Sequence, residues 1–177
     1  YCHCRIADRC GTVRAACPCG SAGRRPGIVG RFCDDTYTAL LDGGAAAAPL
    51  YHLATDTLIH LHQNFSGTTE LPIFDSARFL EQTMLLCEVC PREENAGKSF
   101  SRAWAGPLAR AMAVPSSLLL RDFHAGNLFH LPDRPGVRAC GLIDFQDAGI
   151  GPVTYDLVSL LQDARRDVVR DVVSSCL

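Results

Sequence analysis

The chain changes from helical to strand-like spacing at Leu118-Leu119-Leu120-Arg121-Asp122-Phe123-His124-Ala125-Gly126-Asn127-Leu128-Phe129-His130-Leu131. A second apolar run, residues 139–145, follows a cluster of Pro, Asp and Gly. Two short apolar runs joined by such a turn are typical of a β-hairpin. The predicted hairpin places Asp122 and Asn127 before its first strand and Asp144 at the end of its second.

Helical spacing precedes this hairpin. Residues 34–41 predict a short helix that ends at Gly43, and Pro49 is expected to open a longer one. The longer helix has apolar residues three and four positions apart, at Leu50, Leu53, Ala54, Leu58, Leu61 and Phe65. Asp75 has the residue type that caps a helix, because its carboxylate can accept a backbone N–H.

Two more helices are predicted around the hairpin. One is expected to start at Ser99 or Ser101 and to end before Pro115, and the other to be capped by Thr154. Residues 149–152 have the Gly and Pro content of a loop. The predicted fold class is therefore α+β, mostly helical, with one small hairpin.

Composition limits the classes of partner. The 177 residues are 47% hydrophobic and 20% charged, which is typical of one globular domain with a real core. The net charge of −2 gives no reason to expect nucleic acid or an anionic membrane as a partner. No apolar run is long enough to cross a bilayer and no signal-peptide pattern is present, so we expect a cytoplasmic protein.

Three polar residues around the hairpin have the types that phosphoryl transfer requires. Asp122 could accept the proton of an attacking hydroxyl, and Asn127 and Asp144 offer hard oxygen ligands for Mg²⁺ on nucleotide phosphates. A loop Asp that caps its own backbone, a turn Asn and a strand-end Asp are the structural alternatives. The spacing of the three residues on one hairpin favours the functional interpretation.

Two further residues admit two roles each. His124 could donate to a phosphate, or it could hold the loop through a backbone carbonyl, which we favour. Asp156 could be buried and accept backbone N–H groups from the loop before the hairpin. Alternatively, Asp156 could be exposed in the first turn of its helix, where a negative charge favours the helix dipole. His60 and His62 point to different sides of one helix and do not predict a metal pair.

The first residues differ in character from the rest. Six of the ten cysteines lie within residues 1–33, at Cys2, Cys4, Cys10, Cys17, Cys19 and Cys33. Their C-x-C pairs could form a zinc module, although zinc ligands are usually spaced more widely. Residues 1–27 show no helical or strand period and resemble GC-rich coding DNA read out of frame, so we expect an irregular leader. Cys87 and Cys90 have redox spacing, but they close a helical pattern.

At the residues of the hairpin the chain resembles the aminoglycoside phosphotransferase family, small-molecule kinases with a protein-kinase-like fold. The resemblance runs from about Ile28 to the C-terminus and is strongest over residues 118–163. Residues 143–161 look like the bacterial anomeric kinases that phosphorylate N-acetylmuramate and N-acetylglucosamine in cell-wall recycling. The resemblance implies ATP and Mg²⁺ as cofactors and an amino-sugar hydroxyl as acceptor. It implies that Asp122 is catalytic, that Asn127 and Asp144 bind Mg²⁺, and that Asp156 supports the loop.

The chain departs from this family before the hairpin. No Gly-rich phosphate loop, strand lysine or partner glutamate precedes it, and Lys98, the only lysine, is expected in the loop after residue 92. Residues 28–177 are therefore expected to form a kinase C-lobe, cut short at its C-terminus, with the N-lobe largely missing. Such a chain is expected to be weakly active or inactive. A non-catalytic remnant that binds nucleotide or sugar is the alternative.

Overall fold

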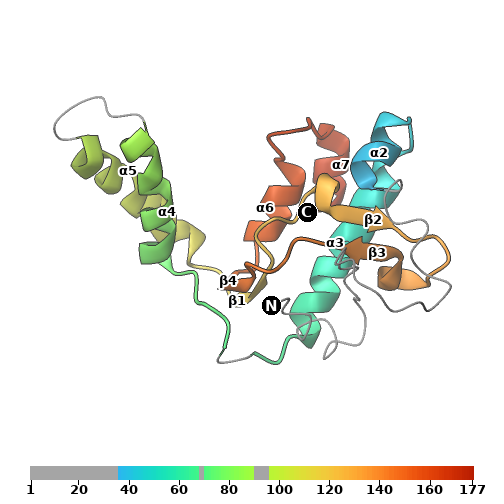
Figure 1. Cartoon of the computed structure of the whole chain (residues 1–177), viewed down its shortest axis with the longest axis horizontal. Coiled ribbons are helices and arrows are strands. Elements are labelled where there is room, and N and C mark those ends of the chain that lie inside the picture. Colours follow the sequence, from blue (N-terminus) through green and yellow to red (C-terminus); the bar gives the residue numbers. More distant parts are fainter. Residues whose placement is uncertain (1–35, 68–69, 90–95) are drawn as a thin grey trace, which may run out of the picture.

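The computed structural model describes residues 36–67, 70–89 and 96–177. The expected leader over 1–27, the zinc module over 1–33 and Cys90 lie outside these ranges. The described elements, shown in Figure 1, are α2 (Tyr37–Asp42), α3 (Ala47–Asn64), α4 (Ser76–Val89), α5 (Ala96–Ala111), β1 (Ser116–Leu119), η1 (Ala125–Asn127), β2 (Leu128–His130), η2 (Gly136–Ala139), β3 (Cys140–Leu142), β4 (Gly149–Pro152), α6 (Tyr155–Leu161) and α7 (Arg170–Ser175).

Helix α3 is the centre of the core. Its buried face carries Leu50, Tyr51, Ala54, Thr57, Leu58 and Leu61 at helical spacing, and it contacts β1, β3, η2, α6 and α7. The long amphipathic helix predicted from this pattern is confirmed. It begins at Ala47, two residues before Pro49, because proline is tolerated in the first helical turn, where its missing N–H would have no helical partner.

The predicted helix starts agree with the structure to different degrees. Asp75 caps α4 as expected, since its Oδ1 accepts the Arg78 N–H at 2.9 Å. Thr154 stands at the N-cap of α6, but its side chain makes no capping hydrogen bond. The prediction that α5 starts at Ser99 or Ser101 was wrong, and Lys98 lies on this helix rather than in a loop. The first turn of α5 packs on α4, where Gly97 lets Met84 approach closely.

Two small antiparallel sheets support the loop that carries Asp122. The predicted hairpin is confirmed as β2 paired with β3, with Leu128 opposite Leu142 and His130 opposite Cys140. The loop predicted at 149–152 was wrong, because β4 pairs with β1. Glycine makes this strand fit: a Cβ on Gly149 would lie 2.4 Å from the Phe74 ring and 2.5 Å from the Pro72 carbonyl oxygen.

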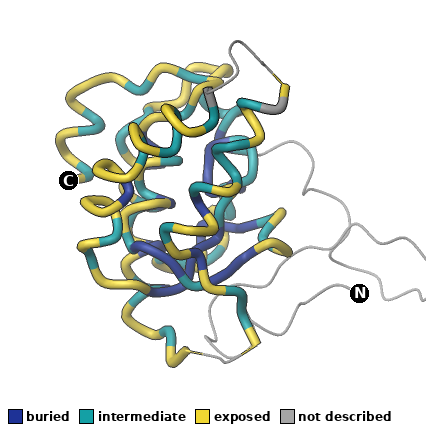
Figure 2. Tube along the Cα trace, turned by 90° about the vertical axis from the view of Figure 1, so that its left-hand side faces the viewer, coloured by how far each residue is buried: buried dark blue, intermediate teal, exposed yellow. Residues whose placement is uncertain are grey.

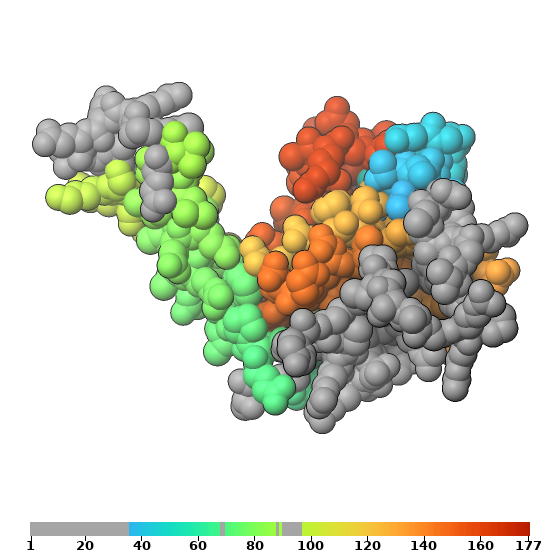
Figure 3. Space-filling model, viewed as in Figure 1, coloured from blue at the N-terminus to red at the C-terminus, as the bar shows by residue number. Residues whose placement is uncertain are grey.

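The α4–α5 pair forms an arm that extends from the body of the molecule (Figure 1). Buried segments gather inside the trace, and the helices present exposed outer faces (Figure 2). A second, smaller core joins the arm to the body through Phe74, Phe79, Leu108 and Leu119. The surface is hollowed between the arm and the body (Figure 3). Within the described ranges, no helix combines the length and the apolar character needed to span a bilayer.

Candidate active site

Asp122, Asn127 and Asp144 line one pocket. The pocket encloses about 190 Å³, including space open to solvent. Asp122 and Asp144 are exposed, and Asn127 is half-buried. The remaining lining residues are apolar: Leu120, Phe123, Leu128, Leu142, Ile143 and Phe145. Two carboxylates and an amide thus converge on a small pocket whose other walls are hydrocarbon.

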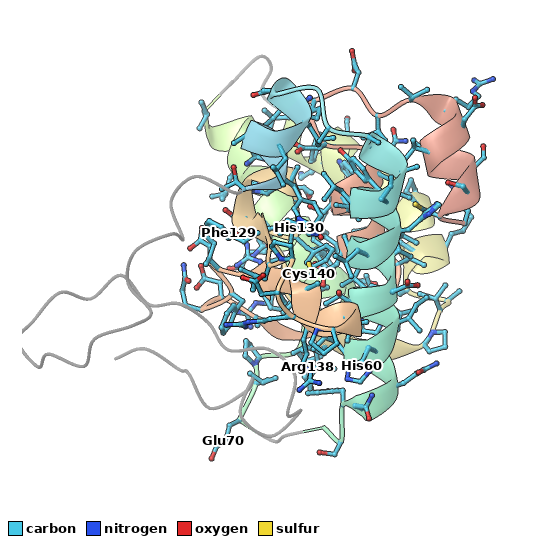
Figure 4. All side chains as sticks on the ribbon, turned by 90° about the vertical axis from the view of Figure 1, so that its right-hand side faces the viewer. His60, Glu70, Phe129, His130, Arg138 and Cys140 are labelled. Carbon is cyan, nitrogen blue, oxygen red and sulfur yellow. The ribbon has the colours of Figure 1, made fainter. Side chains whose placement is uncertain are left out.

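Asn127 ties the two strands of the hairpin to the loop. Its Nδ2 donates to the backbone oxygen of Asp122 at 3.0 Å, and its backbone oxygen accepts the Ile143 N–H at 3.1 Å. Because the amide nitrogen is engaged by the loop, the Asn127 Oδ1 is the atom left to bind a cation. The hairpin itself is seen from its outer side in Figure 4, where its paired residues His130 and Cys140 are labelled.

Left-handed backbone flanks the pocket. Asp144 has φ 61° and Arg121 has φ 75°, and neither is glycine. Such a conformation is costly for a residue with a Cβ and is found mainly where function requires it. The Asp144 Oδ1 accepts the Gln146 Nε2 at 2.7 Å, which fixes the carboxylate after the strand ends.

His124 holds the loop. The ring is buried, and its Nδ1 accepts the Gly126 N–H at 3.2 Å at the start of η1. The Asn127 N–H donates to the His124 backbone oxygen at 2.9 Å. His124 therefore contacts the loop backbone, as in the favoured alternative, but its ring accepts an N–H group and the expected contact with a backbone carbonyl was wrong.

Asp156 has the geometry of the buried alternative. Only 2% of it is exposed, and its two carboxylate oxygens accept the N–H groups of Leu120 at 2.6 Å and of Arg121 at 2.9 Å. Burial raises the pKa of Asp156 to about 6; the two backbone hydrogen bonds oppose this shift and the Asp122 charge adds to it. One buried carboxylate therefore fixes the bend that delivers Asp122 to the pocket.

Three residues near the site, Arg121, Phe74 and Tyr155, were not predicted from the sequence. The Arg121 guanidinium lies 5.0 Å from the centroid of the Phe74 ring, and Tyr155 stacks on Phe79 at 5.3 Å. Arg121 directly precedes Asp122, and Tyr155 directly precedes Asp156, so these positions could have indicated a role near the site. Nothing in the sequence around Phe74 indicates a contact with the loop.

His62 is also structural. Its ring Nε2 lies 3.1 Å from the Leu118 backbone oxygen on β1, and burial lowers its pKa. His60 lies on the same helix, and among the described residues no group of three His, Cys, Asp or Glu side chains is arranged to hold a metal ion.

Comparison with known proteins identifies the family. The model of the phosphotransferase enzyme family matches residues 39–174. The chain belongs to this family. Among its curated relatives are proteins named N-acetylmuramate/N-acetylglucosamine kinase. The protein from Caulobacter vibrioides is 33% identical over 158 residues, which are 81% of this chain and 44% of that protein. The one from Pseudomonas putida is 31% identical over 77% of this chain and 40% of that protein. The chain thus spans less than half the length of these relatives.

Solved structures of phosphotransferases share the fold. The structure of a gentamicin–APH(2")-IIa complex superposes with a TM-score of 0.54 at 20% identity, over 89% of this chain and 53% of that chain. A choline/ethanolamine kinase family protein from Mesorhizobium loti gives 0.56 at 12% identity, over 98% and 56%. The helix-rich, kinase-like fold expected from the sequence is confirmed.

The donors of this phosphotransferase pocket suit Mg²⁺. The Asp144 carboxylate and the Asn127 Oδ1 are hard oxygen donors, and both residues line the pocket. Mg²⁺ is usually bound by one or two protein groups and completes its shell with water and phosphate oxygens. A two-donor site of this kind fits a cation that arrives with a nucleotide.

Proposed function

We propose that this protein transfers the γ-phosphoryl group of ATP, with Mg²⁺, to a hydroxyl of a small molecule. The acceptor in this proposal is the anomeric hydroxyl of an amino sugar, N-acetylmuramate or N-acetylglucosamine, in cytoplasmic cell-wall recycling. The observation that carries the proposal is the convergence of Asp122, Asn127 and Asp144 on one pocket. The names of the curated relatives support the choice of acceptor.

Each polar residue has a role that its surroundings support. Asp122 is exposed at the pocket, so it can orient the acceptor hydroxyl and take its proton. Asn127 and Asp144 would hold Mg²⁺, which neutralises phosphate charge when it is bound. Asp156 and His124 act through the backbone: they fix the loop from residue 120 to residue 127 by the hydrogen bonds described above.

One observation favours a second candidate, a nucleotide- or sugar-binding module without transfer. Kinases of this type hold the α- and β-phosphates with a lysine on a strand. Lys98, the only lysine of the chain, lies on α5. A chain that binds both ligands without this contact is expected to transfer phosphate slowly.

An activity assay on the full chain tests the proposal. We expect Mg²⁺-dependent conversion of ATP to ADP in the presence of N-acetylmuramate or N-acetylglucosamine. Asp122→Ala is expected to reduce the rate by about 10²-fold or more, because general-base catalysis typically contributes that much. The matched control is Asp133→Ala, which removes an exposed carboxylate from the turn of the same hairpin and should leave the rate unchanged.

The outcomes separate the two candidates. Sugar-dependent turnover that Asp122→Ala abolishes supports the kinase. Binding of Mg²⁺–nucleotide without turnover, weakened by Asp144→Asn, supports the binding module. If the chain is folded by circular dichroism and shows no binding and no turnover, both candidates are rejected.

A further inference from the structure

Two arginines share one aromatic ring beside the proposed catalytic Asp122. The Arg78 guanidinium, from the first turn of α4, lies 4.7 Å from the Phe74 centroid, and the Arg121 guanidinium lies 5.0 Å from it. The two cations are therefore no more than about 10 Å apart, roughly the Debye length at 0.1 M salt, so they repel each other in solution.

Neither arginine of this pair forms an ion pair among the described residues. The ion pairs found there join Arg165 to Asp163 and Arg166 to Asp42. Asp156 is engaged by two backbone N–H groups. Asp122, next to Arg121 in the chain, faces the pocket. Two guanidinium groups held together with no ion-pair partner form a ready site for an anion, above all a carboxylate, which matches their planar fork.

The pair lies away from the proposed magnesium ligands. Asn127 and Asp144 line the pocket with Asp122, whereas Arg78 and Arg121 do not line it. In phosphoryl transfer the attacking and leaving oxygens lie roughly in line on opposite sides of the phosphorus. An acceptor must therefore approach Asp122 from the side away from the nucleotide.

The base of the α4–α5 arm carries Arg78 and lies outside the lining of the pocket with the proposed magnesium ligands. The stack of Phe79 on Tyr155 joins the first turn of α4 to the start of α6, and from there the arm and the body diverge around the hollow seen in Figure 3. Burial raises the pKa of the Tyr155 hydroxyl, Arg121 opposes this shift, and Asp156 and Asp122 reinforce it. The Tyr155 hydroxyl therefore senses both the arginine and the catalytic carboxylate, which places all three in one electrostatic neighbourhood.

We infer that Arg78 and Arg121 form a specificity site that recognises the carboxylate of an anionic amino-sugar acceptor. The inference rests on the proposed function and refines its acceptor. N-acetylmuramate carries a lactyl carboxylate that N-acetylglucosamine lacks, so the two sugars differ in the group that the pair would bind. The site makes this protein discriminate in favour of the anionic sugar.

Binding and kinetics of the full chain test this inference with the two sugars as internal controls. Arg78→Gln removes a cation from the exposed first turn of α4. It is expected to weaken N-acetylmuramate binding and kcat/KM at least roughly tenfold, because a charge-assisted hydrogen bond contributes about that factor. The same change should alter the values for N-acetylglucosamine less than about threefold. A higher NaCl concentration should weaken the binding of N-acetylmuramate more than the binding of N-acetylglucosamine, because salt screens the charge interaction.

Two further variants guard against a misleading result. Arg121→Lys keeps the charge but loses the fork and should retain part of the preference. The matched control is Arg138→Gln, an exposed arginine on η2, next to the hairpin on the opposite side of the molecule from the arm (Figures 1 and 4).

Each outcome decides one question. Binding that favours N-acetylmuramate and loses this preference in Arg78→Gln supports the inference even if no phosphate is transferred, in which case only the kinase proposal fails. Equal turnover of both sugars, unchanged by Arg78→Gln, overturns the inference and leaves the kinase proposal standing. Absence of N-acetylmuramate binding to the folded chain also overturns the inference.

Discussion

The Asp156→Asn substitution should remove a pH dependence of folding stability. Burial raises the pKa of Asp156 from 3.8 to about 6, so the folded protein holds this proton at pH values where the unfolded chain has lost it. The stabilisation from this group is complete below about pH 4 and is lost as the pH rises through 6. Asparagine has a similar shape and cannot titrate.

The magnitude follows from the two pKa values. The step from 3.8 to about 6 corresponds to about 3 kcal/mol of unfolding free energy, of which about 2 kcal/mol is lost between pH 4.5 and pH 7.5. The stability of the wild-type chain minus that of Asp156→Asn should therefore fall by about 2 kcal/mol over this range.

Urea unfolding followed by circular dichroism at pH 4.5, 5.5, 6.5 and 7.5 measures this difference. Asp133→Asn, an exposed carboxylate in the hairpin turn, is the control and should follow the wild type at every pH. Parallel curves for the wild type and Asp156→Asn would refute the reasoning, because they would mean that the two backbone N–H groups offset the burial of the charge completely.

The remaining predictions concern packing. Gly149→Ala should lower the unfolding free energy by about 1–3 kcal/mol, because its Cβ would overlap the Phe74 ring and the Pro72 oxygen. Gly106→Ala on exposed α5 should stabilise instead, because the nearest described atom to its Cβ would be the Arg110 guanidinium at 3.7 Å. Equal melting temperatures for the two variants would contradict the close fit at β4. Tyr51→Phe should leave the melting temperature unchanged or raise it, since the buried Tyr51 hydroxyl has no hydrogen-bond partner among the described residues. A loss above about 1 kcal/mol in a thermal melt would show that the hydroxyl is hydrogen-bonded.

Local signals explain what the sequence could predict. The apolar spacing of α3, the Asp75 cap and the turn between the two strands of the hairpin each depend on residues within a few positions of one another. The same local signals placed Asp122, Asn127 and Asp144 at the ends of the hairpin strands, and the structure brings these three residues to one pocket. Their roles in binding and transfer remain predictions.

Distant contacts explain what the sequence missed. Strand β4 has a Gly-Ile-Gly-Pro sequence that is unfavourable for a strand, and its partner β1 lies more than thirty positions earlier. The burial of Asp156 depends on the N–H groups of Leu120 and Arg121, which are 36 and 35 positions away. An Asp in the first turn of a helix can be buried or exposed, and its position in the sequence is the same in both cases. Spacing alone therefore left both alternatives for Asp156 open.

The left-handed backbone at Arg121 links the loop to the inferred specificity site. Glycine would adopt φ 75° without steric cost, whereas a residue with a Cβ loses roughly 1–2 kcal/mol there. The Asp156 hydrogen bonds to Leu120 and Arg121 fix this bend whatever the side chain is, since they involve only backbone N–H groups. The arginine side chain must therefore offset its own strain, and its described contact is the Phe74 ring. Phe74 is buried and Arg121 is half-buried, and a cation–π contact at such a site contributes about 1–2 kcal/mol, which is similar to the cost. The inferred anionic ligand would add a further interaction that glycine could not make, which is a physical reason for arginine at a position whose backbone favours glycine.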